Sequence, residues 1–174
     1  MKDLRLEKIN IRAVNVPLNK PIIAHLGTFE KWPFLCLDAY TNKGLIGKSY
    51  IGPYLVDQLP VIAKCIEALS KPFLNQEIKP FNFFEEGFKK TALLGYQGIG
   101  LYALAALDIA FWDVYAKAAN MPLASLLGSD LKPIKTYNSR GLWLIPLDKV
   151  DKEIYDLLDN GSFNALKVRI GWDK

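Results

Sequence analysis

The stretch from residue 97 to residue 120 is apolar on almost every side of the helix that its sequence predicts. A surface helix keeps one polar face, whereas a helix that is apolar all round is buried between other elements. Met121-Pro122 ends this helix, because proline cannot continue one. The chain must therefore place other elements on at least two sides of residues 97–120, which requires a folded core.

Alternating apolar and polar residues predict strands in the first fifty residues, at Leu6–Pro17, Phe34–Thr41 and Gly44–Ile51. Asn42-Lys43-Gly44 has the composition of a hairpin turn. We therefore expect a three-stranded antiparallel meander. Leu18–Pro33 is rich in turn-forming residues and is predicted as a long loop, which inside a compact domain is more often functional than idle.

Helical spacing of apolar residues replaces the alternation after Val56. One helix is predicted up to Pro72, and a second over Phe81–Leu94 with Phe84 and Phe88 on its inner face. The helix over residues 97–120 follows, and Leu123–Gly128 is predicted as a short turn.

The remaining chain shows the pattern of a β-α-β unit. Lys132–Asn138 is predicted as an extended segment, Leu147–Asn160 as an amphipathic helix with Val150, Ile154, Leu157 and Leu158 inward, and Ala165–Ile170 as a strand. A strand, a helix and a strand with short connections place the two strands parallel to each other.

Charge and cysteine usage exclude several classes of function. The net charge of +4 is dispersed, so there is no basic stripe for a nucleic acid. No apolar run approaches the roughly 18–20 residues that span a bilayer, and the N-terminus lacks the apolar core of a signal peptide. Cys36 and Cys65 lack a motif spacing and are predicted to be small buried apolar residues. We therefore expect a cytoplasmic protein.

Lys167-Val168-Arg169 is the strongest candidate for chemistry. Residues i and i+2 of a strand point to the same face, so the two cations would project side by side. Paired cations at a strand end suit a carboxylate ligand or a base with an altered pKa. The groups that would complete such a site would have to follow residue 174. Asp108, Asp113 and Lys117, on the long helix, are instead interpreted as structural, with an i, i+4 ion pair between the last two.

Several segments together resemble the mandelate racemase and muconate lactonizing enzyme family of the enolase superfamily. They are Arg12–Leu18, Gly47–Tyr50 with Tyr54, Gly95-Tyr96, Ala103–Lys117, Pro122-Leu123, Leu126–Gly128, Tyr137–Ser139 and Lys167–Gly171. The resemblance implies an α+β capping domain over residues 1–130, made of the antiparallel meander and a helical bundle. It also implies that residues 131–174 are the truncated start of a (β/α) barrel.

The resemblance further implies Mg²⁺-dependent removal of the proton α to the carboxylate of a hydroxy acid or a sugar acid. The family's metal ligands lie on later barrel strands, so no Mg²⁺ is expected to bind this chain itself. By position, Leu18–Pro33 and Ile51–Tyr54 resemble the two capping loops that shape substrate specificity. Ordinary loop packing is the alternative for the substrate-binding candidates there, which are His25, Phe29, Trp32 and Tyr54.

Lys167 and Arg169 match the family's lysine-x-lysine at the end of the second barrel strand, and they are the catalytic candidates. Arg169 stands where the family has its base, and arginine stays protonated at any ordinary pH. A one-base reaction such as the dehydration of a sugar acid is therefore favoured over racemisation. Asn138 and Arg140, near the end of the first barrel strand, are further substrate-binding candidates by position.

Three explanations remain open for a chain that ends inside its barrel. It is a fragment of an enzyme that is inactive alone, one half of a split enzyme, or a capping domain kept as an interaction module. An exposed sheet edge and apolar helix faces would favour a homo-oligomer or a complementing chain as partner. We favour the first explanation.

Overall fold

The computed structural model describes residues 2–95, 97–159 and 161–171, which leaves Tyr96 and Asn160 of the sequence predictions outside the described residues. The chain forms two compact units. Met1–Val16 and Pro33–Leu131 form the first, here named the sheet–helix unit, and Pro17–Trp32 and Lys132–Lys174 form the second, named the arm unit. Each unit is described by itself.

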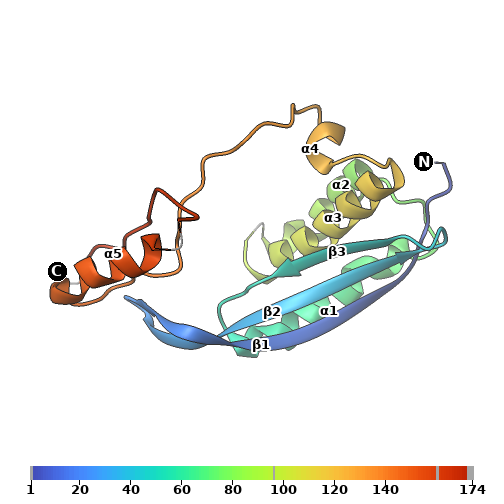
Figure 1. Ribbon diagram of the computed structural model, residues 1–174. Helices are drawn as coiled ribbons and strands as arrows, with labels where there is room; N and C mark the ends of the chain where they lie inside the picture. The colour runs from blue at the N-terminus through green and yellow to red at the C-terminus, as the bar shows by residue number, and fades with distance from the viewer. Residues whose placement is uncertain (1, 96, 160, 172–174) are drawn as a thin grey trace. The chain divides into compact units, whose positions relative to one another are not determined.

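Three strands in the order β1-β2-β3 form one sheet (Figure 1). They are β1 (Leu6–Ala24), β2 (Gly27–Thr41) and β3 (Ile46–Ile51). β2 and β3 pair antiparallel, with Leu35 opposite Ile51 and Tyr40 opposite Ile46. Gly44 adopts a φ of +71° in the turn between them, a conformation that glycine reaches without steric cost. The predicted antiparallel meander is confirmed.

The predicted long loop over Leu18–Pro33 is wrong, because β1 and β2 continue through it as a hairpin that turns at His25 and Leu26. Its prolines suggested a loop, yet they lie where a missing N–H is tolerated. Pro17 and Pro21 are on β1, at the edge of the sheet. Pro33 on β2 precedes Leu35, the first residue paired with β3.

The helices α1, α2 and α3 belong to the sheet–helix unit. Their bounds and those of the remaining helical elements are α1 (Leu59–Ser70), α2 (Pro80–Thr91), α3 (Ile99–Ala118), α4 (Leu123–Leu126) and α5 (Val150–Leu158), with short 3-10 turns at Val56–Gln58, Lys71–Phe73, Ala92–Leu94 and Leu147–Lys149. The predicted turn at 123–128 is thus a single turn of helix. Side chains from β2, α1 and α3 form the core, among them Leu37, Ile62 and Leu107, all at most 1% exposed.

α3 is buried between other elements, as its apolar sequence requires. The statement that no run reaches membrane-spanning length is wrong for this helix, which is long and apolar enough by length and composition. Its packing against α1 and β3 accounts for that composition. The approach to β3 is close: a Cβ on Gly47 would lie 2.1 Å from the carbonyl oxygen of Ala110.

Polar contacts fasten the same crossing of α3 and β3. The predicted ion pair between Lys117 and Asp113 is confirmed, with Nζ and Oδ2 2.5 Å apart. The same Asp113 oxygen accepts a hydrogen bond from the backbone N–H of Lys48 at 2.7 Å, and Lys117 Nζ donates to the carbonyl of Ile46 at 2.9 Å.

The prediction for the inner face of α2 is confirmed for Phe88, which is partly buried against the core, and wrong for Phe84, which is 40% exposed while Phe83 is buried. Phe83 makes edge contacts with Phe73 and Phe111, at ring-centroid distances of 4.8 and 4.6 Å. Phe84 instead stacks on Phe88, four residues later on the same helix. Phe83 and Phe84 are neighbours in the sequence, so apolar spacing alone does not show which of them is buried. The contacts with Phe73 and Phe111, which lie outside α2, select Phe83.

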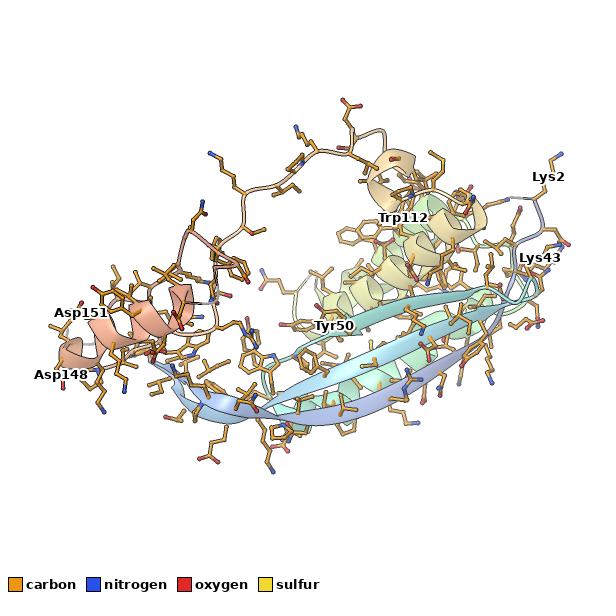
Figure 2. All side chains as sticks on the ribbon, viewed as in Figure 1. Lys2, Lys43, Tyr50, Trp112, Asp148 and Asp151 are labelled. Carbon is orange, nitrogen blue, oxygen red and sulfur yellow. The ribbon has the colours of Figure 1, made fainter. Side chains whose placement is uncertain are left out.

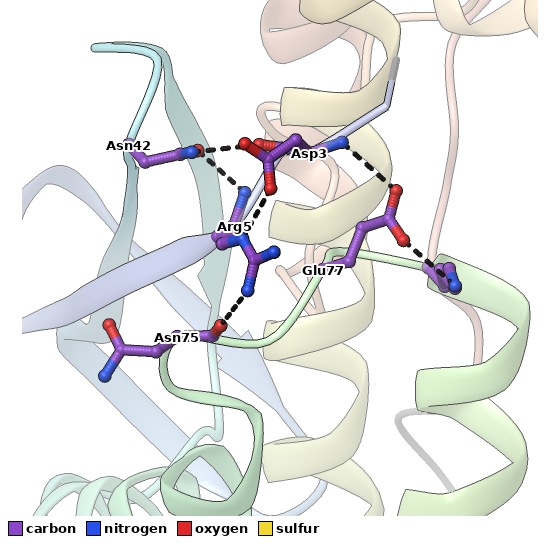
Figure 3. A network of polar contacts seen from close by, with 6 residues as sticks. Asp3, Arg5, Asn42, Asn75 and Glu77 are labelled. Atoms are coloured by element: carbon purple, nitrogen blue, oxygen red, sulfur yellow. Dashed lines mark hydrogen bonds and ion pairs between the residues drawn. The ribbon is translucent and has the colours of Figure 1, made fainter.

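A polar network ties the start of β1 to two turns (Figure 3). The Arg5 guanidinium binds the Asp3 carboxylate at 2.6 Å and donates to the carbonyl of Asn75. Asn42 accepts from the backbone N–H of Arg5 and donates to the carbonyl of Asp3. Because these groups are exposed, the network fixes geometry more than it adds stability.

In the arm unit, the predicted parallel pairing reduces to one bridge between Asn138 and Leu166. Full strands over Lys132–Asn138 and Ala165–Ile170 are therefore wrong for the described residues. α5 lies between them in the sequence, with Asp148 and Asp151 at its start (Figure 2), where carboxylates interact favourably with the helix dipole. Leu158 is partly exposed, against the prediction, whereas Val150, Ile154 and Leu157 are half-buried.

Candidate substrate-binding site

Lys167 and Arg169 lie on an extended segment that is held by backbone hydrogen bonds. The N–H of Lys167 donates to the carbonyl of Asn138, and the N–H of Arg169 donates to the carbonyl of Leu142, both at 2.9 Å. Both cationic side chains are exposed. These two hydrogen bonds to Asn138 and Leu142 thus fix the backbone positions of Lys167 and Arg169.

Arg169 lies over the ring of Trp143, with its guanidinium carbon 4.8 Å from the ring centroid. This cation–π contact holds a side chain that is otherwise exposed to solvent. The Trp143 indole nitrogen is buried and has no hydrogen-bond acceptor among the residues that the structure describes. The sequence predictions missed Trp143, because a tryptophan in a loop carries no motif and its partner is 26 residues away.

Asn138 is buried and its side chain is fully engaged with backbone groups. Its Nδ2 donates to the carbonyl of Leu157 at the end of α5, and its Oδ1 accepts from the N–H of Arg140 at 2.9 Å. This structural role accounts for the residue by itself. The Arg140 side chain is exposed, so of these two candidates it is the one that can meet a ligand.

The arm, residues 17–32, supplies three of the predicted pocket residues. His25 is exposed at its turn, and Phe29 makes an edge contact with Trp32 at 5.8 Å between ring centroids. Two contacts join the arm to later residues of the same unit. The carbonyl of Ile23 accepts from the N–H of Leu144 at 3.2 Å, and Lys20 Nζ lies 2.5 Å from the buried Glu153 carboxylate.

Tyr54 belongs to the sheet–helix unit, where its side chain is 57% exposed. Its φ of +67° is uncommon for a bulky residue. The arm unit contains the other predicted site residues, and Tyr54 is described apart from them.

A groove of about 370 Å³ borders Arg169 in the arm unit. Its walls are mostly apolar, and Arg169 is the one charged residue among the described residues that line it: Leu142, Trp143, Leu144, Ile145, Pro146, Leu147, Val150, Val168, Arg169, Ile170 and Gly171. An apolar wall beside a single cation weakens competition from water for an anionic ligand.

Two carboxyl groups of the sheet–helix unit have displaced pKa values. A hydrogen bond from Arg12 holds the pKa of the Asp38 carboxyl below its usual range, with Coulombic attraction adding to it. Burial raises the pKa of the Asp108 carboxyl, and a hydrogen bond from Trp112 acts in the opposite direction. The Oδ1 atom of Asp108 is buried without a partner among the described residues. Burial likewise raises the pKa of the Cys65 thiol, which is half-buried, as Cys36 is.

Metal-binding side chains do not gather among the described residues of this chain. Within residues 2–95, 97–159 and 161–171, no three His, Cys, Asp or Glu side chains lie close enough together to hold an ion. Mg²⁺ takes several oxygen ligands in near-octahedral geometry. The described residues therefore do not fit Mg²⁺.

Comparison with known proteins gives the setting for these features. L-talarate/galactarate dehydratase from Salmonella typhimurium is 38% identical over 81 residues, which are 46% of this chain and 20% of that protein. A D-galactonate dehydratase family member, RspA, from Cellvibrio japonicus is 63% identical over 142 residues, or 79% of this chain and 34% of that protein. An enolase from the alpha proteobacterium BAL199, solved with bound magnesium, has a TM-score of 0.92 and 33% identity over 98% of this chain and 48% of its own.

The chain spans less than half the length of the curated relatives it resembles. Residues 7–128 match the family described as the mandelate racemase/muconate lactonizing enzyme N-terminal domain. That match covers more than two thirds of the chain, and the sheet followed by helices agrees with it. The chain therefore belongs to the mandelate racemase/muconate lactonizing enzyme family of the enolase superfamily and carries its N-terminal capping domain.

Proposed function

We propose that this chain is the capping domain, residues 1–130, and the first β-α-β of the barrel, residues 131–174, of an enzyme that dehydrates a sugar acid. The proposed reaction begins with removal of the proton α to the substrate carboxylate. Family membership supports this class of chemistry, and two relatives named as dehydratases of sugar acids support the substrate class.

The observation that carries the proposal is arginine at position 169, two residues after Lys167. Arginine cannot accept a proton at ordinary pH, so Arg169 serves as a carboxylate clamp and not as a base. A guanidinium binds a carboxylate through two parallel N–H donors, which fixes the orientation of the acid. Lys167 adds a second cation that stabilises the negative charge developing on the carboxylate. Racemisation requires a base on each face of the reacting carbon, and an arginine leaves this face without one. In the proposed dehydration the base that accepts the α-proton would lie on a later barrel strand of the complete enzyme.

His25, Phe29 and Trp32 of the arm are proposed as substrate contacts, and Tyr54 of the sheet–helix unit stays a separate candidate. Arg140 is proposed as a further polar contact. A hairpin arm can close over a bound acid as one body, which excludes water from the reacting carbon.

No step is assigned to Mg²⁺ on this chain, because its described residues do not offer the ligands. A relative was solved with bound magnesium, and in the complete enzyme the ion would stabilise the enediolate. We expect the 174-residue chain alone to bind no Mg²⁺ and to show no turnover.

A chimera tests the proposal most directly. Residues 1–171 would replace the matching N-terminal part of the Cellvibrio japonicus relative, and formation of a 2-keto-3-deoxy acid from D-galactonate and other sugar acids would be measured with Mg²⁺. The chimera is expected to turn over at least one sugar acid, and Arg169→Met is expected to reduce kcat/KM by about a hundredfold or more, as loss of an orienting charged contact does.

Lys43→Met, which removes an exposed cation from the turn between β2 and β3, serves as the matched control and should leave kcat/KM within about twofold. Racemisation without dehydration, or full activity in Arg169→Met, would contradict the proposal. Mg²⁺-dependent turnover by the 174-residue chain alone would contradict the expectation that it is inactive.

A further inference from the structure

Trp143 lies between two backbone hydrogen bonds that join it to different parts of the arm unit. On one side, the carbonyl of Leu142 accepts from the N–H of Arg169 at 2.9 Å. On the other side, the N–H of Leu144 donates to the carbonyl of Ile23 on the arm at 3.2 Å. The segment 142–144 therefore connects the arm to the extended segment that carries Arg169.

Leu142 makes this segment rigid. Its side chain is 2% exposed, and its backbone adopts a φ of +51°. A bulky residue persists in the left-handed region only where its surroundings enforce the conformation. The direction in which the chain presents Trp143 is thus set by the burial of Leu142 and by the two flanking hydrogen bonds.

The ring of Trp143 restricts Arg169. An exposed arginine samples many rotamers and loses that freedom when it binds a ligand. The guanidinium carbon lies over the indole ring, and the N–H donors that point away from the ring stay open to a ligand. This contact therefore leaves donors available for a carboxylate and removes part of the entropy loss in advance.

We propose that Trp143 is a positioning residue that holds Arg169 ready for a carboxylate, and that the arm sets the position of Trp143 through Leu144. The proposal rests on the proposed function, in which Arg169 is the carboxylate clamp. It adds a specificity element outside the two cations, and it explains why a large aromatic residue lies in the groove beside a single charge.

NMR on the full chain tests the contact without a ligand. The Arg169 side-chain protons are expected to show ring-current shifts and cross-relaxation with the Trp143 ring. Both should vanish in Trp143→Leu and persist in Trp143→Phe, while Trp112→Leu, a matched change in the sheet–helix unit, should leave them unaltered. Arg169 signals typical of a freely rotating side chain in the wild-type protein would overturn the proposal.

Titration with D-gluconate, a polyhydroxylated carboxylate, tests the consequence for binding. Trp143→Leu is expected to weaken binding about two- to fivefold, the range of an exposed cation–π contact, and Trp143→Phe should recover most of it. Weakened binding in Arg169→Met with none in Trp143→Leu would overturn the positioning role alone. Unchanged binding in Arg169→Met would overturn the role of Arg169 and with it the proposed function.

Discussion

Different kinds of interaction stabilise the interior of each of the two units. Among the described residues, the buried apolar side chains belong to the sheet–helix unit with the one exception of Leu142. The buried side chains of the arm unit are otherwise polar, namely Asn138 and Glu153, and each is engaged by a specific partner. Hydrophobic burial stabilises without regard to direction, whereas hydrogen bonds specify one geometry and add about 1 kcal/mol each. Apolar burial therefore stabilises the sheet–helix unit, whereas directional polar contacts fix the geometry of the arm unit.

The largest expected effect tests the close packing of the sheet–helix unit. Gly47→Ala would place a Cβ 2.1 Å from the backbone oxygen of Ala110, which no rotamer change can relieve. We expect a loss of about 3 kcal/mol or more in the free energy of unfolding, measured by urea denaturation followed by circular dichroism.

Gly100→Ala is the control for this substitution. Its Cβ would meet only Thr91 at 3.5 Å, so the exchange within α3 should be neutral or stabilising by up to about 1 kcal/mol. Equal destabilisation by both substitutions would show that the approach of β3 to α3 does not limit this unit.

The second prediction tests whether polar groups hold the arm unit. Asn138→Leu removes the hydrogen bond to Leu157 and leaves the N–H of Arg140 without its acceptor. We expect a cost of about 1–3 kcal/mol confined to this unit. Hydrogen exchange should accelerate at the amides of Arg140 and Lys167 and remain unchanged in β2.

Ser139→Ala, at the exposed neighbouring position, is the matched control and should change exchange little. Faster exchange throughout β2 in Asn138→Leu would mean that the two units unfold together, which would remove the distinction drawn between them.

The smallest effect concerns the ion pair between the half-exposed Arg12 and the buried Asp38 of the sheet–helix unit, and its dependence on pH. Because Arg12 lowers the pKa of the folded Asp38 carboxyl, this group contributes stability above its unfolded pKa of about 4. That contribution is lost as the pH falls through the lower, folded pKa. Asp38→Asn should therefore cost about 1 kcal/mol at pH 7, and the difference from wild type should shrink below pH 4. Thermal unfolding across this pH range measures it, and a difference that stays constant with pH would contradict the assigned cause.

The sequence predicted the sheet–helix unit better than the arm unit, for a physical reason. Apolar periodicity predicts α3 and the meander, because the apolar side chains of both pack into a core. The hairpin at 17–32 was predicted as a loop from its turn-forming residues, because the sequence does not show that Pro17 and Pro21 lie on the edge strand β1, where a missing N–H is tolerated. Trp143 was missed altogether, since its partner Arg169 is distant in sequence and no periodicity links them. The roles of the candidate site residues stay predictions.

Asp113 has a consequence for anyone who recombines this fold with that of a relative. Its carboxylate serves a backbone amide on β3 and a lysine on its own helix, and that lysine in turn reaches a carbonyl on β3. If α3 were transferred to a relative without residues 46–48, Asp113 and Lys117 would be separated from the backbone groups of β3 that they bind here. β3 and α3 therefore form a single cassette, and a crossover point belongs before β3 or after α3 and not between them.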